Sequence, residues 1–402
     1  MKRSYPLVAL LLMLPLSLAA VKKNMQAFAE GGGQAAGLDG FFAGQVERYG
    51  LAAIGACIVR DGKVAWSNGF GLADIEAKRR ATADTIFPVG SVSKTVTLAA
   101  FMRLLEQGRC SLDDDISRYL PYKLRNPRFP DRPITLRHLL SFTSGIFDVD
   151  LQAGRNRLSF LEEERDPKVS AATALKEFLV PGGRHYSPEN FLEFAPGAHY
   201  AYSNSSYSLV GAVVERVSGR PFWEFCRDEL FAPLGMKNST WRLSDLDQAR
   251  YAFGYRREAG KLVKEPPATW PGYMDGGLRT TPRDFGRFLA MMAGNGMFAG
   301  KRVLKAETLG LMLVPQAAAG APAGKGFPVV SRGLVWILSQ AGERRVWQMN
   351  GFGPSFFAQV YFDPGKKTAG AFFTTGGFRS FDEMGRAVRE MLTTLLEYED
   401  KV

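Results

Sequence analysis

The chain has 402 residues, of which 46% are hydrophobic and 23% charged. These are ordinary globular values, which exclude a fibrous repeat or disorder throughout, and the length allows one large domain or two interlocked ones. The formal charge of +11 is spread along the chain without a basic block interleaved with aromatics, so we expect no nucleic-acid partner. We interpret it as a solvated basic surface, with attraction to anionic envelope polymers or membrane surface as the alternative.

Residues 1–29 have the pattern of a secretory signal peptide. Lys2 and Arg3 precede an apolar run at residues 5–20, which is too short to span a bilayer comfortably. Small residues at 19–20 and at 27–29 offer two cleavage sites, and an uncleaved N-terminal anchor is the alternative. We therefore expect an exported, periplasmic or extracellular protein, with peripheral envelope association left open and the oligomeric state undetermined.

The hydrophobic pattern changes period twice along the chain. After a Gly-rich linker at residues 31–37 it alternates as in strands, with Asp61 and Gly62 as a tight turn, and from Ser91 it becomes helical up to a stop at Gly108. The expected elements are strands at residues 54–60 and 63–70, helices from 91, at 205–217 and at 282–293, strands at 333–339, 345–349, 356–362 and 368–374, and an amphipathic helix through 381–395.

Strands at both ends of the chain enclose a mainly helical middle. We predict an α/β (α+β) fold, in which an antiparallel sheet flanked by helices is built from residues 38–90 and 275–402. Residues 91–274 would form an inserted helical domain. A cleft is expected between the two domains.

Ser91 and Lys94 lie three residues apart where the first long helix begins, so they share one face of that helix. There the free backbone N–H groups and the helix dipole can stabilise an oxyanion. Lys94 lies among apolar residues, where desolvation lowers the pKa of an amine and lets it accept the serine proton. The alternative is an exposed lysine beside an N-cap serine.

Tyr202 and Asn204 precede the second clear helix. A phenol at such a position can relay a proton between a serine and a leaving group, and an amide can hold a substrate carbonyl or orient the lysine. The alternatives are a core aromatic for Tyr202 and an N-cap for Asn204 or Ser205.

The ordered set of segments resembles the serine β-lactamase and penicillin-binding superfamily, in the branch of class C β-lactamases, D,D-peptidases and related esterases. The resemblance covers nearly all of the mature chain. The segments that carry it are residues 61–64, 87–95, 107–108, 111–114, 134–140, 143–145, 196–197, 202–204, 233–236, 276–278 and 281–284. The resemblance implies a class C β-lactamase-like fold, with Ser91 as the acylated nucleophile, Lys94 and Tyr202 as base and proton relay, and Asn204 as a substrate-binding group.

The third motif of this superfamily usually reads Lys-Thr-Gly or His-x-Gly. Here the aligned residues are Met349, Asn350 and Gly351, which we place with Asn204 as substrate-binding positions. A thioether has no charge and donates no hydrogen bond, so Met349 does not suit a substrate carboxylate. The resemblance implies that the N–H groups of Ser91 and Phe352 form the oxyanion hole. Phe142, where many relatives have His, is interpreted as a packing change.

The remaining candidate groups receive structural interpretations. We assign His138, His185 and His199 structural roles, since the Ser/Lys/Tyr arrangement needs no histidine base. Three cysteines, Cys57, Cys110 and Cys226, are too few for a disulfide framework, although one pair is possible in an exported chain. We expect no metal and no cofactor.

The leading hypothesis is an exported serine hydrolase that forms an acyl-enzyme at Ser91 on a small-molecule ester or amide, with an esterase favoured. The second is a D,D-peptidase or β-lactamase acting on cell-wall peptides or β-lactams. A third, from another class, is a non-catalytic relative that binds peptidoglycan or a protein partner.

Overall fold

The computed structural model describes residues 34–150, 155–156, 164–316, 328–399 and 401, so the predicted signal peptide lies outside the described residues. The strands of the main sheet are β1 Ala53–Arg60, β2 Lys63–Asp74, β3 Arg79–Arg80, β12 Val329–Arg332, β13 Ile337–Ala341, β14 Arg344–Gly353, β15 Phe356–Asp363 and β16 Thr368–Thr375. They form one eight-stranded antiparallel sheet in the order β12-β13-β14-β15-β16-β1-β2-β3.

Strands from the N-terminal and C-terminal parts of the chain are neighbours in this sheet, because β1 pairs with β16 from Ala53 opposite Thr375 to Arg60 opposite Thr368. The predicted first hairpin is confirmed. Asp61 and Gly62, with φ of 50° and 72°, form the left-handed two-residue turn that matches the twist of paired strands.

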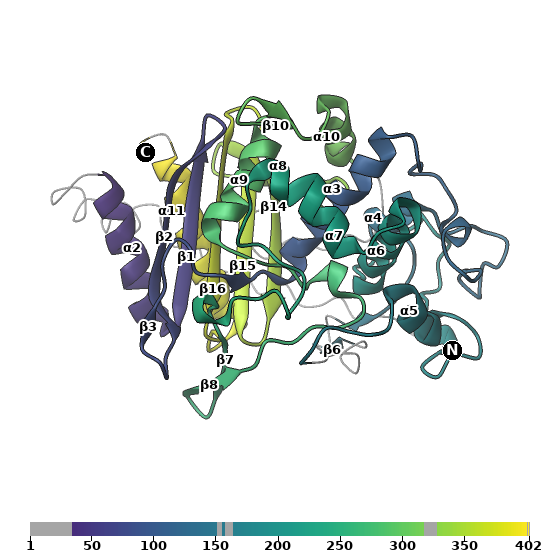
Figure 1. Ribbon diagram of the computed structural model, residues 1–402, viewed down its shortest axis with the longest axis horizontal. Helices are drawn as coiled ribbons and strands as arrows, with labels where there is room; N and C mark the ends of the chain where they lie inside the picture. Colours follow the sequence, from purple (N-terminus) through teal and green to yellow (C-terminus); the bar gives the residue numbers. More distant parts are fainter. Residues whose placement is uncertain (1–33, 151–154, 157–163, 317–327, 400, 402) are drawn as a thin grey trace.

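Helices cover both faces of the sheet (Figure 1). Helices α2 Gln34–Tyr49 and α11 Phe381–Tyr398 lie on one face, and α9 Pro282–Ala293 packs on β16, β1 and β2 from the other. Alternate residues of β1 supply the two interfaces: Ile54 and Ile58 join the cluster of α2 and α11, and Cys57 joins the larger core. This burial on both faces explains why the strand reads as an almost continuous apolar run.

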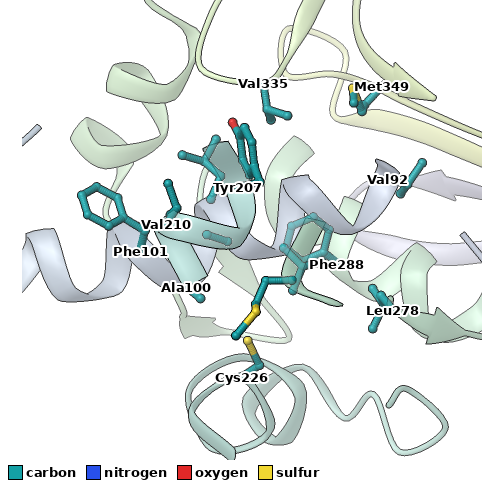
Figure 2. Packing of buried hydrophobic residues seen from close by; sticks show 14 of the residues in the cluster. Val92, Ala100, Phe101, Tyr207, Val210, Cys226, Leu278, Phe288, Val335 and Met349 are labelled. Atoms are coloured by element: carbon teal, nitrogen blue, oxygen red, sulfur yellow. The ribbon is translucent and has the colours of Figure 1, made fainter. Parts of the chain in front are cut away.

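The helical part of the chain lies beyond α9, on the right in Figure 1. Its helices are α3 Ser93–Glu106, α4 Leu136–Leu140, α5 Ala171–Leu179, α6 Asn204–Ser218, α7 Phe222–Cys226 and α8 Ala232–Leu234. Helix α3 is buried along nearly its whole length and contacts α6. Figure 2 shows this packing, with Ala100 and Phe101 of α3 near Tyr207 and Val210 of α6.

Shorter elements connect these layers. They are η1 Gly90–Val92, η2 Ile116–Arg118, η4 Pro188–Asn190, η5 Arg227–Phe231, η6 Gln248–Arg250, η7 Tyr273–Asp275, α10 Ala306–Leu313, and the strand pairs β4 Phe87–Pro88 with β9 Arg279–Thr280, β5 Val149–Asp150 with β6 Arg155–Asn156, β7 Gly254–Glu258 with β8 Lys261–Glu265, and β10 Met297–Phe298 with β11 Lys301–Arg302. Among the described residues, no helix combines the length and apolarity that a bilayer span requires.

Three local predictions are wrong. Helix α2 begins at Gln34, within the expected Gly-rich linker. Of the strand expected at residues 333–339, only residues 337–339 lie in a strand, β13, because Val335 has φ of +60° and Gly333 N–H donates to the Trp336 carbonyl in the turn that follows β12. The helix expected from Ser91 starts at Ser93, since a 3-10 turn precedes it. The division into domains at residues 90/91 and 274/275 stays a prediction.

Candidate active site

Ser91 lies in η1, between the short strand β4 and helix α3. Gly90 has φ of +50°, in the left-handed region that favours glycine, and this lets the chain turn sharply from strand to helix. Ser91 is partly exposed, whereas Gly90 and Val92 on either side are buried. The turn therefore presents the Ser91 hydroxyl at the surface of a rigid core.

The structure brings the three predicted catalytic side chains together. Tyr202 Oη lies 2.5 Å from Ser91 Oγ, and Lys94 Nζ lies 3.1 Å from the same oxygen. Lys94 Nζ is also 5.0 Å from the centroid of the Tyr202 ring. A hydroxyl, an amine and a phenol thus meet at one point.

Lys94 is fully buried in the first turn of α3. Its Nζ lies 2.8 Å from Asn204 Oδ1 and 2.6 Å from the Asp275 carbonyl oxygen. Burial lowers the pKa of Lys94 to about 8, against the opposing charges of Asp275 and Asp148. In the neutral form its two N–H groups donate to the two carbonyl oxygens, and the lone pair faces the Ser91 hydroxyl. Lys94 is therefore arranged as a proton acceptor.

Tyr202 is arranged as a proton donor. Burial raises the pKa of its phenol far above the ordinary value, so the group keeps its proton. The phenol O–H can then donate to Ser91 Oγ while the Ser91 O–H points to Lys94. Burial therefore favours a neutral amine at Lys94 and a protonated phenol at Tyr202.

Phe142 supports the Tyr202 ring. The two rings stack with centroids 4.7 Å apart and planes 29° apart, and the Phe142 carbonyl accepts a 2.7 Å hydrogen bond from Ala201 N–H. Phe142 has φ of +57°, a rare conformation for a bulky residue. The substitution interpreted from sequence as a packing change therefore has a definite position, directly against the candidate proton donor.

The start of α6 is fixed by a buried carboxyl group. Asp148 accepts hydrogen bonds from Ser203 Oγ at 3.1 Å, from Asn204 N–H at 3.0 Å and from Ser205 N–H. Ser203 is the N-cap and accepts from Ser206 N–H, so neither Asn204 nor Ser205 caps the helix. The Asn204 side chain turns instead toward Lys94, where its amide oxygen accepts a hydrogen bond.

Asp275 is a buried acidic residue of the site that no sequence motif indicates. Its carbonyl accepts from Lys94, and its Oδ2 lies 2.9 Å from Ser208 Oγ, which is also 2.9 Å from the Gly272 carbonyl. Burial raises the pKa of the Asp275 carboxyl. The Ser208 hydroxyl has only one hydrogen to donate. When it donates that hydrogen to the Gly272 carbonyl, the hydrogen bond between Ser208 and Asp275 must be donated by a protonated Asp275 carboxyl group. In the sequence, Asp275 appears only as a single acidic residue in an apolar run, immediately before Gly276.

The third-motif strand β14 touches the nucleophile turn. A Cβ on Gly351 would lie 1.9 Å from the Val89 carbonyl oxygen and 2.9 Å from Ser91 N, so the backbones meet only because this residue is glycine. Only two residues close the β14–β15 hairpin, after the pair Gly353–Phe356. By the alternation of an antiparallel ladder, the Phe352 N–H then points away from β15.

That N–H faces an open edge of the sheet. The pairing of β13 with β14 ends at Ile337 and Gln348, before Phe352 is reached. The Phe352 nitrogen lies 3.3 Å from where a Cβ on Gly90 would be, beside the Ser91 turn. The Phe352 N–H therefore lies beside the Ser91 turn, and the N–H groups of Ser91 and Phe352 stay the candidate oxyanion donors.

The residues of the third motif point in different directions. Asn350 and Phe352 are exposed, whereas Met349 is 4% exposed and belongs to the main core. Figure 2 shows Met349 among the packed residues of that core, which also include Val335. Met349 thus contributes packing rather than a group at the open edge.

The histidines and cysteines that the structure describes have other environments. His138 Nδ1 accepts from Thr135 N–H at 3.1 Å and closes a capping box of α4, and the His199 ring packs on Phe194. The three cysteines are free, and burial raises the pKa of each thiol. Across the described ranges, no cluster of three His, Cys, Asp or Glu side chains could hold a metal ion.

The family model described as Beta-lactamase matches residues 38–393. Among curated proteins, the D-alanyl-D-alanine-carboxypeptidase/endopeptidase AmpH of Escherichia coli strain K12 is 25% identical over 354 residues, which are 86% of each chain. Protein flp of Staphylococcus aureus strain MW2 is 26% identical over 210 residues, 52% of this chain and 39% of flp.

Two solved structures share the fold. The octameric penicillin-binding protein homologue from Pyrococcus abyssi has a TM-score of 0.72 and 24% identity, covering 90% of this chain and 77% of that one. The D-amino acid amidase from Ochrobactrum anthropi SV3 has a TM-score of 0.68 and 21% identity, covering 95% of this chain and all (100%) of that one.

Proposed function

This chain belongs to the beta-lactamase family, an enzyme family of serine hydrolases, and from that premise we propose that it forms an acyl-enzyme at Ser91 on an uncharged ester or amide, with esters favoured. The observation that carries the proposal is the position of Ser91 Oγ, 3.1 Å from Lys94 Nζ and 2.5 Å from Tyr202 Oη. A nucleophile with an adjacent base and an adjacent donor is the minimum set for acyl transfer.

The proposed reaction has two steps. Ser91 Oγ attacks the substrate carbonyl carbon as its proton passes to Lys94, and the N–H groups of Ser91 and Phe352 hold the resulting oxyanion. The bond to the leaving oxygen then breaks, that oxygen takes a proton from Tyr202, and Lys94 returns a proton to Tyr202. In the second step, water attacks the acyl-enzyme with the same proton transfers, and the reaction releases a carboxylic acid and free Ser91.

The preference for an uncharged substrate rests on Met349. This position carries Lys or His in the resembling motif, and here the side chain is apolar and buried in the core. A substrate carboxylate would find no cation there, and burial of an unpaired charge is unfavourable. Esters without an anionic group meet no such penalty.

Action on D-amino acid peptides or β-lactams is the second candidate. The similarity to AmpH supports it, and so does Arg332, whose guanidinium lies 4.7 Å from the centroid of the Tyr200 ring, two residues before Tyr202. A guanidinium group such as that of Arg332 is suited to binding a substrate carboxylate. Covalent labelling by a fluorescent penicillin, competed by D-Ala-D-Ala peptides, would favour this candidate over the esterase.

The test of the leading proposal is hydrolysis of p-nitrophenyl acetate and butyrate. Ser91→Ala should reduce kcat/KM by about a thousandfold or more, whereas Ser111→Ala, at an exposed serine after α3, should leave it unchanged. Equal turnover by the wild type and Ser91→Ala would refute acylation at Ser91. If a fluorophosphonate probe also fails to label the protein, the non-catalytic binding role becomes the better description.

We further propose export through residues 1–29, which carry the signal pattern. Expression of the full chain followed by cell fractionation and N-terminal sequencing tests this. A mature N-terminus after residue 20 or 29 in the exported fraction supports a cleaved signal, and an intact Met1 on membranes supports an anchor.

A further inference from the structure

Two exposed phenylalanine rings meet beside the candidate oxyanion hole. Phe352 is 53% exposed and Phe381 is 59% exposed, and their ring centroids lie 5.8 Å apart with planes at 43°. Phe352 belongs to β14 and Phe381 is the first residue of α11. Single exposed apolar residues are common on protein surfaces, whereas two large exposed rings in contact form a small apolar patch.

The backbone of Phe352 connects this pair to the reaction. Its N–H is the candidate second oxyanion donor, so a bound carbonyl oxygen would lie within one hydrogen bond of this residue. Side chains alternate along β14, with Met349 and Gly351 facing the core and Asn350 and Phe352 facing outward. The Phe352 ring therefore lies on the side of β14 opposite to the Ser91 turn, where α11 begins, and a group attached to the reacting carbonyl would reach it past the open edge of β14.

The start of α11 next to the pair does not favour an anion. Ser380 caps the helix and accepts from Glu383 N–H at 3.1 Å. Arg379 forms an ion pair with Glu383 at 3.0 Å, and Asp382 adds another acid to the first turn. The positive end of the helix dipole is thus already compensated by acidic side chains. The local charge favours an uncharged ligand group.

We propose that Phe352 and Phe381 form an apolar subsite that binds an uncharged alkyl or aromatic group of the substrate. This inference rests on the proposed function and deepens it by naming the substrate class: esters with a hydrophobic acyl or alcohol part. Such a group gains by covering the two rings, which water now contacts. The acyl part and the alcohol part share this chemistry, and the experiment separates them.

The experiment compares two ester series on the full-length enzyme. One series is p-nitrophenyl acetate, butyrate, hexanoate and octanoate, and the other is acetate esters of ethanol, butanol, hexanol and benzyl alcohol followed in a pH-stat. In the series that occupies the subsite, wild-type kcat/KM should rise by about two- to fourfold per added methylene over the first few carbons. The rise should appear mainly as a lower KM.

Phe381→Ala is the informative variant, because Phe381 is exposed and supplies no group to the reaction. It should reduce kcat/KM for the longest ester of that series by about tenfold and for acetate by less than about threefold. Phe381→Leu should keep most of the wild-type preference for long esters. Val263→Ala, at an exposed apolar residue of the β7–β8 hairpin, is the control and should leave that preference unchanged. Thermal melting of each variant separates loss of fold from loss of selectivity.

The outcomes distinguish the two proposals. Ser91-dependent turnover with a chain-length profile that is flat, or that Phe381→Ala leaves unchanged in both series, overturns the subsite and leaves the serine hydrolase standing. Absence of any Ser91-dependent ester turnover overturns the esterase and, with it, this subsite. A chain-length preference that Phe381→Ala abolishes in one series supports the subsite and assigns its occupant.

Discussion

The carbonyl oxygen of Asp275 accepts a 2.6 Å hydrogen bond from Lys94 Nζ, and the carboxyl group of the same residue is enclosed beside that amine. One residue therefore both orients the candidate base and adds a titratable charge next to it. Asp148, at the start of α6, is a second buried acid whose charge also acts on Lys94. The protonation of Lys94 consequently depends on tertiary neighbours as well as on its own burial.

The first prediction concerns pH. Lys94 accepts a proton only when neutral, and its pKa is lowered to about 8, so kcat/KM for an uncharged ester should fall as pH decreases through that value. The measurement is a pH profile from 5.5 to 9.5, corrected for spontaneous hydrolysis. Lys94→Met should lose about a thousandfold in kcat across this range, and a flat wild-type profile would contradict the assigned base.

The second prediction concerns Asp275→Asn. Removal of the negative charge removes an interaction that favours the ammonium form of Lys94, so the acidic limb of the same profile should move to lower pH by about one unit. The carbonyl contact to Lys94 remains in this variant. Asp131→Asn, at an exposed acid, is the matched control and should not shift the limb. A shift to higher pH would show that the Asp275 charge does not act in this way.

The third prediction concerns Phe142→Leu. Loss of the stacked ring leaves Tyr202 freer to move from Ser91, so kcat should fall about tenfold with little change in KM. The smaller side chain should also reduce the free energy of unfolding by about 1–2 kcal/mol. Phe142→Tyr, which keeps an aromatic ring, should retain more of the kcat. An equal kcat in Phe142→Leu and the wild type would mean that the stacking does not position the phenol.

The fourth prediction concerns Gly351→Ala. The new Cβ would meet the Val89 carbonyl at 1.9 Å, so β14 and the Ser91 turn must separate and the two oxyanion donors must move apart. We expect kcat to fall by about a hundredfold or more. Gly44→Ala in α2, where a Cβ would meet no atom within 4 Å, should instead raise the melting temperature slightly. Steady-state kinetics and thermal melting check both variants.

Much of the fold follows from periodicity and turn chemistry. The sequence predicts the hairpin at Asp61 and Gly62, helix α9 and the strand pair β15–β16 close to their observed bounds, because each combines a regular apolar pattern with a clear turn or cap signal. The sequence does not indicate the start of helix α2, because the first turn of this helix lies in a Gly-rich segment. Its apolar face becomes stable only when Leu38 and Phe42 pack against the sheet.

Residue identity and spacing along the chain are enough to name the candidate groups: Ser91 and Lys94 one helical turn apart, Tyr202 and Asn204 before a second helix, and an apolar residue where a cation is expected. The surroundings of these groups come only from the fold. The burial of Lys94 and Tyr202, the contact of Asp275 with the amine, the stacking of Phe142 and the pairing of Phe352 with Phe381 join segments far apart in the chain. Protonation and apolar binding depend on surroundings in space, and spacing along one chain does not specify those surroundings.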